Sequence, residues 1–252
     1  MQISVCTDIV FSGVSTSDAI KAVKSCGIHA VEFWSWWDKD IDAIDRARRE
    51  AGVEIVAFCT KSNGLTDASR HDEYKAALAE TIVVAKKLGC KRIISQVGND
   101  TGRPASEQTQ NIIEGLRHCA PLLEDAGITL VIEPLNTRVD HTGYFLWSSD
   151  EGAAIVDAVD SPCVKLLFDL YHQQIMEGDI IRRSVSMLDR IGHFHAAGTP
   201  GRHELAIGEI NYEAVFDALH ENGYNGYVGF EYMPLNRVED GLETWAVKDC
   251  FK

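Results

Sequence analysis

The sequence predicts an α/β protein that folds as a single (β/α)8 TIM barrel. Three observations lead to this prediction. Eight short apolar runs recur along the chain, segments with apolar residues at helical spacing separate them, and no Pro/Gly/Ser-rich linker divides the 252 residues. We therefore expect one domain over residues 1–252.

The eight runs are rich in β-branched and aromatic residues, as expected of short buried strands. In chain order they are ISVCTD (3–8), AVEFWS (30–35), EIVAFCT (54–60), RIISQVG (92–98), TLVIEPL (129–135), VKLLFDL (164–170), GHFHAA (192–197) and GYVGFEY (226–232). Eight strands in a chain of this length suit a closed barrel better than an open sheet.

The segments between the runs follow a helical pattern. Residues 17–27 and 74–90 carry apolar side chains at spacings of three and four, and both contain a Gly near the end that suits a helix C-cap. Strands that alternate with helices pair in parallel through crossover connections. This alternation predicts that the strands share one direction around the barrel.

Polar residues end four of the later runs. Glu133 lies late in the fifth run, Asp169 in the sixth, His195 in the seventh and Glu231 in the eighth. In a TIM barrel the active site is built at the C-terminal ends of the strands. We therefore expect these four side chains to meet at the mouth of the barrel, although a single acid at a strand end is more often a cap or an ion-pair partner.

Three carboxylates in one enclosed site would repel one another and become partly protonated unless a cation balances them. A set of oxygen ligands with one imidazole favours Mn2+, Mg2+ or Co2+, and zinc remains an alternative. The sequence thus predicts a divalent metal site at Glu133, Asp169, His195 and Glu231. His193 shares the strand face of His195 one layer deeper, so His195 is the expected ligand.

Further candidates lie in the loops after the strands. Arg202 and His203 stand in GTPGRHE (198–204), and His172 follows Asp169 by three residues. We expect these three to contact substrate, with Arg202 binding a carboxylate or hydroxyl through its planar fork of donors. Two features stay open. Glu32 either pairs with a basic neighbour or joins the mouth, and WSWWDK (34–39) either walls a pocket or covers the barrel top.

The composition of the chain restricts the classes of partner that we expect it to bind. The formal net charge of -14 disfavours a nucleic-acid partner, because Lys and Arg supply most of the affinity for phosphate. The sequence has no basic start followed by a long apolar region and no membrane-span-length apolar stretch, so we expect no membrane association and a cytoplasmic location. The 7 cysteines show no CxxC spacing, which indicates reduced thiols. We expect a small-molecule partner, and a homo-oligomer stays open.

The segments VIEPLN, FDLYHQQ, HFHAAGTPGRHELAIGEINY and GFEYMP together resemble the hydroxypyruvate isomerase family of xylose isomerase-like barrels. They are similar, more distantly, to ketose 3-epimerases of the tagatose and psicose type. The resemblance implies that Glu133 and Glu231 are the acid/base pair, and that Asp169 and His195 complete a metal shell. His195 departs from some hydroxypyruvate isomerases, which have glutamine there.

The expected reaction is therefore a metal-dependent interconversion of hydroxypyruvate and tartronate semialdehyde through an enediolate. Reprotonation of the neighbouring carbon would isomerise the substrate, whereas reprotonation of the same carbon from the other face would epimerise it. The same two glutamates serve either outcome, so a ketose 3-epimerase is the alternative. An endonuclease for abasic DNA and a non-catalytic sugar-binding regulator are weaker readings, because of the acidic charge and the paired glutamates.

Overall fold

The structure is a computed structural model that describes residues 1–251. Its strands form one closed parallel barrel in the order β1-β2-β3-β4-β5-β6-β7-β8. The strands are β1 (Gln2–Cys6), β2 (Ala30–Phe33), β3 (Glu54–Cys59), β4 (Arg92–Ser95), β5 (Thr129–Ile132), β6 (Val164–Asp169), β7 (Ile191–Ala196) and β8 (Tyr227–Phe230). The predicted (β/α)8 barrel is confirmed; only Lys252, the last residue of the predicted domain, lies outside the described residues.

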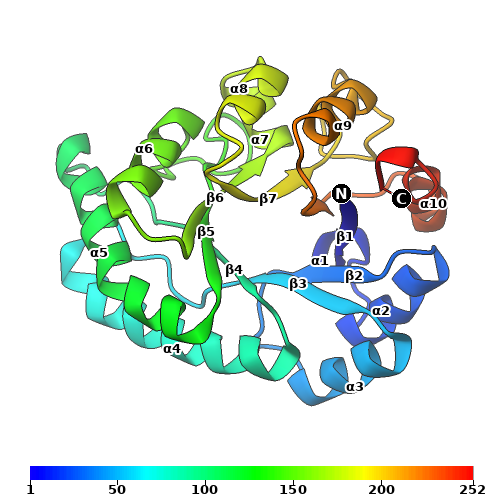
Figure 1. Ribbon diagram of the computed structural model, residues 1–252, viewed down its shortest axis with the longest axis horizontal. Coiled ribbons are helices and arrows are strands. Elements are labelled where there is room, and N and C mark those ends of the chain that lie inside the picture. Colours follow the sequence, from blue (N-terminus) through cyan, green and yellow to red (C-terminus); the bar gives the residue numbers. More distant parts are fainter. Residues whose placement is uncertain (252) are drawn as a thin grey trace.

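Helices form a ring around the strands, as Figure 1 shows. They are α1 (Thr7–Val10), α2 (Thr16–Ser25), α3 (Ile41–Ala51), α4 (His71–Leu88), α5 (Ala105–Ala126), α6 (Ser149–Val159), α7 (Leu170–Met176), α8 (Ile180–Ser186), α9 (Tyr212–Glu221) and α10 (Val238–Ala246), with short 3-10 turns η1 (Ala68–Arg70) and η2 (Asp249–Phe251). Gly89 ends α4 in the left-handed region at a φ of 71°, as the sequence pattern predicts.

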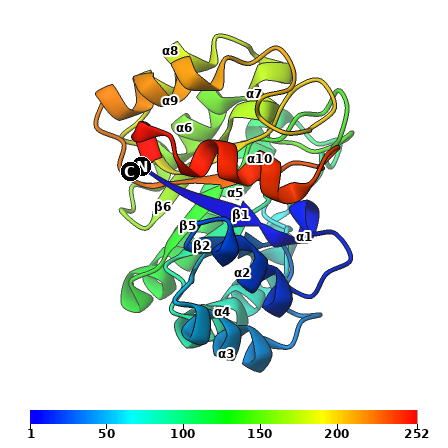
Figure 2. The ribbon, with the colours of Figure 1, turned by 90° about the vertical axis from the view of Figure 1, so that its right-hand side faces the viewer.

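The barrel closes where its first and last strands pair, with Ile3 opposite Val228. In the side view of Figure 2, β1 lies beside the red segment around α10, and residues of both segments line one hollow there. Within residues 1–251 no helix is both long and apolar enough to cross a membrane.

The main core lies between the barrel and its helices and includes Ile20, Phe58 and Leu116, all fully buried. A second small cluster is made of residues from β2 to β6, among them Val56, Ile94, Val131 and Leu167. Inward-pointing strand residues fill the interior of such barrels in layers. Packed side chains therefore fill the interior of the barrel, as in other barrels of this kind.

Candidate active site

The four predicted residues come together at the C-terminal mouth of the barrel. Asp169 is the last residue of β6, His195 lies in β7, and Glu133 and Glu231 directly follow β5 and β8. One side-chain ligand atom from each lies within 4.8 Å of those from the others. All four side chains are buried. Parallel strands therefore carry residues far apart in the sequence to one enclosed point.

A cavity of about 330 Å³ opens onto this cluster. It is lined by Glu133, His195 and Glu231 and by Trp34, Trp37, Gln96, His141, His172 and Arg202. A larger hollow of about 500 Å³ lies near the start of β1, lined by Met1, Ile28 and Phe251 among others. No metal-ligating cluster of the described residues lies there. The smaller cavity is therefore the candidate site.

His195 connects two groups of carboxylates. Its Nε2 lies 3.0 Å from Glu32 Oε2 on one side. Its Nδ1 lies 3.6 Å from Glu133 Oε1 and 3.3 Å from Glu231 Oε2, and this buried nitrogen has no hydrogen-bond partner among the described residues. Burial by itself lowers the pKa of His195, but Glu231 and Glu32 outweigh it and hold that pKa well above its usual value.

The two glutamates of the predicted acid/base pair sit in different electrostatic surroundings. Burial raises the pKa of Glu133 to about 7, against the opposing effect of His195. Burial also acts on Glu231, but Arg202 and His195 outweigh it and hold its pKa well below the usual value. Two carboxyl groups whose surroundings separate their pKa values can take opposite states of protonation.

Arg202 lines the cavity, but two of its donor nitrogens are already bonded to Glu231. Its Nη2 pairs with Glu231 Oε2, its Nε donates to the main-chain oxygen of Glu231 over 3.3 Å, and its guanidinium lies 5.3 Å from the ring centre of Tyr171. The sequence predicted that the guanidinium of Arg202 contacts substrate. In the structure Nε and Nη2 of that guanidinium are bonded to Glu231.

Asp169 uses its two oxygens differently. Oδ1 accepts hydrogen bonds from the backbone N–H groups of Tyr171 and His172, at 2.7 and 3.1 Å, and so caps helix α7. Oδ2 lies 3.5 Å from His172 Nε2, and one carboxylate oxygen of Asp169 belongs to the cluster of ligand atoms. The cap and a place in the cluster, which the sequence presented as alternatives, are both features of this residue.

The neighbours of His172 determine its tautomer. Asn136 Oδ1 accepts from the backbone N–H groups of Val139 and Asp140, both at 3.0 Å, so its Nδ2 is the donor. That Nδ2 lies 2.7 Å from His172 Nδ1, which must therefore accept. Burial holds the pKa of His172 well below its usual value, so the ring is neutral with its proton on Nε2. This Nε2 is buried and without a partner among the described residues.

His203 is not brought into the cavity. Its side chain is half-buried, and Nδ1 donates to the main-chain oxygen of Met233 over 2.9 Å. It is not among the residues that line the site. The loop that carries Arg202 to the mouth therefore directs the next side chain elsewhere.

Several site residues were missed or left open at the level of sequence. Glu32 is buried beside His195, and Trp34 Nε1 donates to Glu231 Oε1 while its ring lines the cavity with Trp37. His141 and Asn136 carried no recognised signal. An acid inside the apolar run AVEFWS was a usable signal for Glu32, because an unpaired buried charge is costly.

The cluster fits a divalent metal ion. It offers three carboxylates and one imidazole nitrogen, and that nitrogen is buried without a partner among the described residues. Oxygen-rich sets of this kind suit Mn2+, Mg2+ and similar ions. A bound cation would also balance the carboxylates, which otherwise raise one another's pKa.

Comparison with known proteins finds relatives over most of the chain. Residues 20–248 match the family model described as xylose isomerase-like TIM barrel. A hydroxypyruvate isomerase of Escherichia coli (strain K12) is 32% identical over 86% of this chain and 87% of the relative. A 2-oxo-tetronate isomerase of Cupriavidus necator is 36% identical over 89% of this chain and 90% of the relative. The solved structure of an AP endonuclease, family 2, from Brucella melitensis has a TM-score of 0.92 and 31% identity, over 97% of this chain and 98% of that one.

Proposed function

Because the chain belongs to the xylose isomerase-like TIM barrel family, we propose that it interconverts hydroxypyruvate and tartronate semialdehyde with a divalent metal ion as cofactor. The enzyme is an isomerase, related over most of its length to isomerases of small hydroxy-keto acids. The observation that carries the finer proposal is the buried cluster of three carboxylates and one imidazole at the cavity.

We assign Glu133, Asp169, His195 and Glu231 as the residues that would hold Mn2+, Mg2+ or Co2+. When bound, such an ion stabilises the negative charge that develops on the two oxygens of an α-hydroxy carbonyl as its α-proton leaves. His195 would use Nδ1, the nitrogen that has no other partner among the described residues.

Glu133 and Glu231 are the proposed proton-transfer pair. Glu231 is held ionised by Arg202 and His195 and can accept the α-proton. Glu133 is the second carboxylate at the cavity and would return a proton to the neighbouring carbon through an oxygen that does not bind the ion. Because each carboxylate can accept a proton and give it back, the pair can serve the reaction in either direction.

Two side chains are proposed to orient the substrate. His172 presents a neutral Nε2–H at the cavity and can donate to a substrate oxygen. Arg202 makes hydrogen bonds to Glu231 through Nη2 and Nε, which leaves Nη1 to meet a substrate carboxylate. His203 has no role in this proposal, because it does not line the cavity.

Amide substitution of each glutamate tests the proton-transfer pair. We expect Glu133→Gln and Glu231→Gln each to lower kcat by about 10²–10⁴-fold, the usual contribution of a positioned acid or base. Turnover in D2O should place deuterium on product carbon, which mass spectrometry detects. The control is Gln96→Asn, a change in the cavity lining outside the pair. Unchanged turnover in both glutamate variants would reject the assignment.

A ketose 3-epimerase is the second candidate, favoured by the pairing of Arg202 with Glu231. A substrate carboxylate bound by Arg202 would contribute about 1.5–3 kcal/mol, or roughly 10- to 100-fold in binding. We therefore expect Arg202→Ala to raise KM for hydroxypyruvate by about that factor, with a smaller change for neutral ketoses. Steady-state kinetics of both proteins on hydroxypyruvate, 2-oxo-tetronate and a ketose panel makes the comparison. Faster wild-type turnover of ketoses would favour the epimerase.

We further propose a single domain over residues 1–252, a cytoplasmic location and no nucleic-acid partner. The last point rests on the net charge of -14. It is also the point at which the proposal differs from the activity named for the Brucella relative. Incubation of the metal-loaded protein with a duplex that contains one abasic site should give no strand cleavage.

A further inference from the structure

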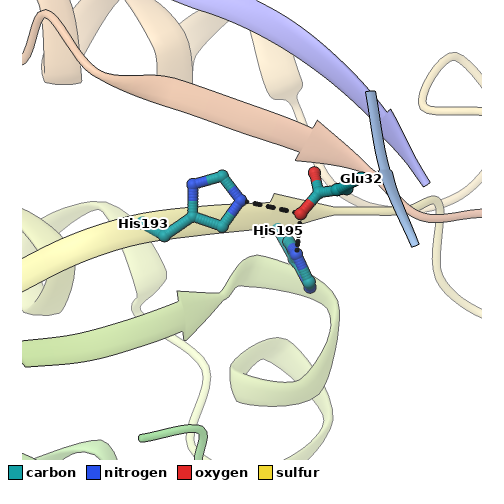
Figure 3. Close-up of side chains that lie close together, drawn as sticks. All are labelled: Glu32, His193 and His195. Atoms are coloured by element: carbon teal, nitrogen blue, oxygen red, sulfur yellow. Dashed lines mark hydrogen bonds and ion pairs between the residues drawn. The ribbon is translucent and has the colours of Figure 1, made fainter. Parts of the chain in front are cut away.

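Glu32 lies inside β2 and is almost fully buried, at 1% exposure. Its carboxylate is hydrogen-bonded on both oxygens. Ser4 Oγ donates to Oε1 over 2.8 Å, and the Nε2 atoms of His193 and His195 each lie 3.0 Å from Oε2. Figure 3 shows the two rings on one strand, both directed at the acid that comes from β2.

The fold leaves room for this carboxylate at one position of β8. A Cβ on Gly229 would lie 2.0 Å from Glu32 Oε1 and 2.7 Å from His195 Cδ2, far inside contact distance. Gly229 is the register partner of both Ser4 and His195. The pairing of β2 with β3 also shifts in register between Val31 and Glu32, and local irregularities of this kind can redirect a side chain. Several strands therefore accommodate the acid at this point.

The hydrogen-bond chemistry restricts the two histidines. A carboxylate has only acceptor atoms, so each ring must present Nε2 with its proton. The remaining nitrogen of His195 is Nδ1, which is buried, has no partner among the described residues and lies 3.3 Å from Glu231 Oε2. Glu32 thus determines which nitrogen of His195 faces the acid cluster.

We propose that Glu32 is a positioning residue that holds His195 with its proton on Nε2 and its Nδ1 free to bind the metal ion. This inference rests on the metal centre of the proposed function. Ser4 and His193 also contact this carboxylate, but neither residue lines the cavity or belongs to the four-residue cluster. Acidic partners of metal-binding histidines set the ring orientation and raise ligand basicity, and their loss typically costs about 10–100-fold in metal affinity.

Metal affinity of three variants tests the proposal. Glu32→Leu keeps a similar volume and removes the acceptor, so we expect the Kd for Mn2+ to weaken by about 10–100-fold. Glu32→Gln should recover most of that loss, because its amide oxygen can accept from both rings while Ser4 turns to accept from the amide. Ser4→Ala is the matched control. It removes a hydrogen bond from the other oxygen of the same carboxylate and should leave the Kd close to that of the wild type.

The measurements are Mn2+ titrations followed by electron paramagnetic resonance, with Tm recorded beside each Kd. A purely structural role of Glu32 would lower Tm and leave the Kd of the folded protein unchanged. A folded Glu32→Leu variant that binds Mn2+ as the wild type does would overturn the inference.

A second measurement needs no folded variant at Glu32. In metal-free wild type labelled with ¹⁵N-histidine, we expect a slowly exchanging proton on Nε2 of His195 that stays there when the pH is raised until the ring is neutral, with the signal assigned by its absence in His195→Gln. A neutral His195 with its proton on Nδ1 would overturn the inference even if every Glu32 variant failed to fold. If the wild type bound no Mn2+, the proposed metal centre would fail, while the tautomer measurement would still decide the role of Glu32.

Discussion

At the scale of single residues, Asn136 controls what His172 can offer to a substrate. Two backbone donors hold the amide oxygen, so the amide nitrogen must donate to His172 Nδ1. The histidine is then a donor at Nε2 and cannot act there as an acceptor. The chemistry of one cavity residue is thus decided by another that does not line the cavity.

This arrangement predicts the effect of Asn136→Asp. A carboxylate at this position accepts only, so His172 would have to donate through Nδ1 and turn an acceptor toward the cavity. Loss of one substrate hydrogen bond, about 0.5–1.5 kcal/mol, should raise KM by roughly 2- to 10-fold. His172→Gln is the reference variant, because it affects the same substrate contact. The KM of the double variant should be no higher than that of the single variant with the higher KM. Independent, additive effects in steady-state kinetics would contradict the coupling.

At the scale of secondary structure, the residue at the junction of β6 and α7 has two roles, one in capping the helix and one in the candidate metal site. Asp169 ends the strand, caps the helix through Oδ1 and belongs to the candidate metal-binding cluster. A cap at a strand-to-helix joint is a common local motif, and the barrel turns this one toward the mouth. The two roles can be separated because Asn caps helices about as well as Asp does.

We therefore expect Asp169→Asn and Asp169→Ala to differ. The asparagine retains the cap and removes the charge, so metal binding should weaken while the free energy of unfolding of the metal-free protein changes little. The alanine removes both and should also lose about 0.5–2 kcal/mol of stability. Urea unfolding of the metal-free proteins, with metal titration by calorimetry, measures both quantities. Equal stabilities of the two variants would show that the cap contributes nothing.

At the scale of the whole molecule, closure of the barrel creates the site. Glu32 on β2 meets His195 on β7 only because β1 and β8 pair and complete the ring. The ligand candidates likewise come from four strands or strand ends between β5 and β8. A metal ion bound at this point would link the elements that the chain must bring together.

Metal binding should consequently stabilise the native protein. An ion that binds only the folded state, at a free concentration 100 times its Kd, adds about 2.7 kcal/mol, or roughly 5–10 °C in Tm for a chain of this size. The shift should grow as pH rises through 7. Glu133, whose pKa is raised to about 7, must be deprotonated before it can bind the ion. Differential scanning calorimetry with Mn2+ or Mg2+ measures the shift. Chelator should reverse it and abolish activity, and Asp169→Asn should show little of it.

Much of the fold could be predicted because its signals are local. Each strand is a short apolar run, and the alternation with helical segments implies a parallel barrel. Four of the site positions could be predicted for the same reason. Glu133, Asp169, His195 and Glu231 each end or follow a strand, and the C-terminal ends of parallel strands meet at one face.

The sequence by itself therefore determined the barrel, the sequence positions that converge at its mouth and the kind of ligand they offer. Only the tertiary structure decided that Glu32 holds His195, that Arg202 pairs with Glu231 and that His203 points elsewhere. These outcomes depend on a register shift in β2, on the room left by Gly229 and on the path of a Gly/Pro loop. Such features are set by packing between distant segments, and no local pattern of residues encodes them.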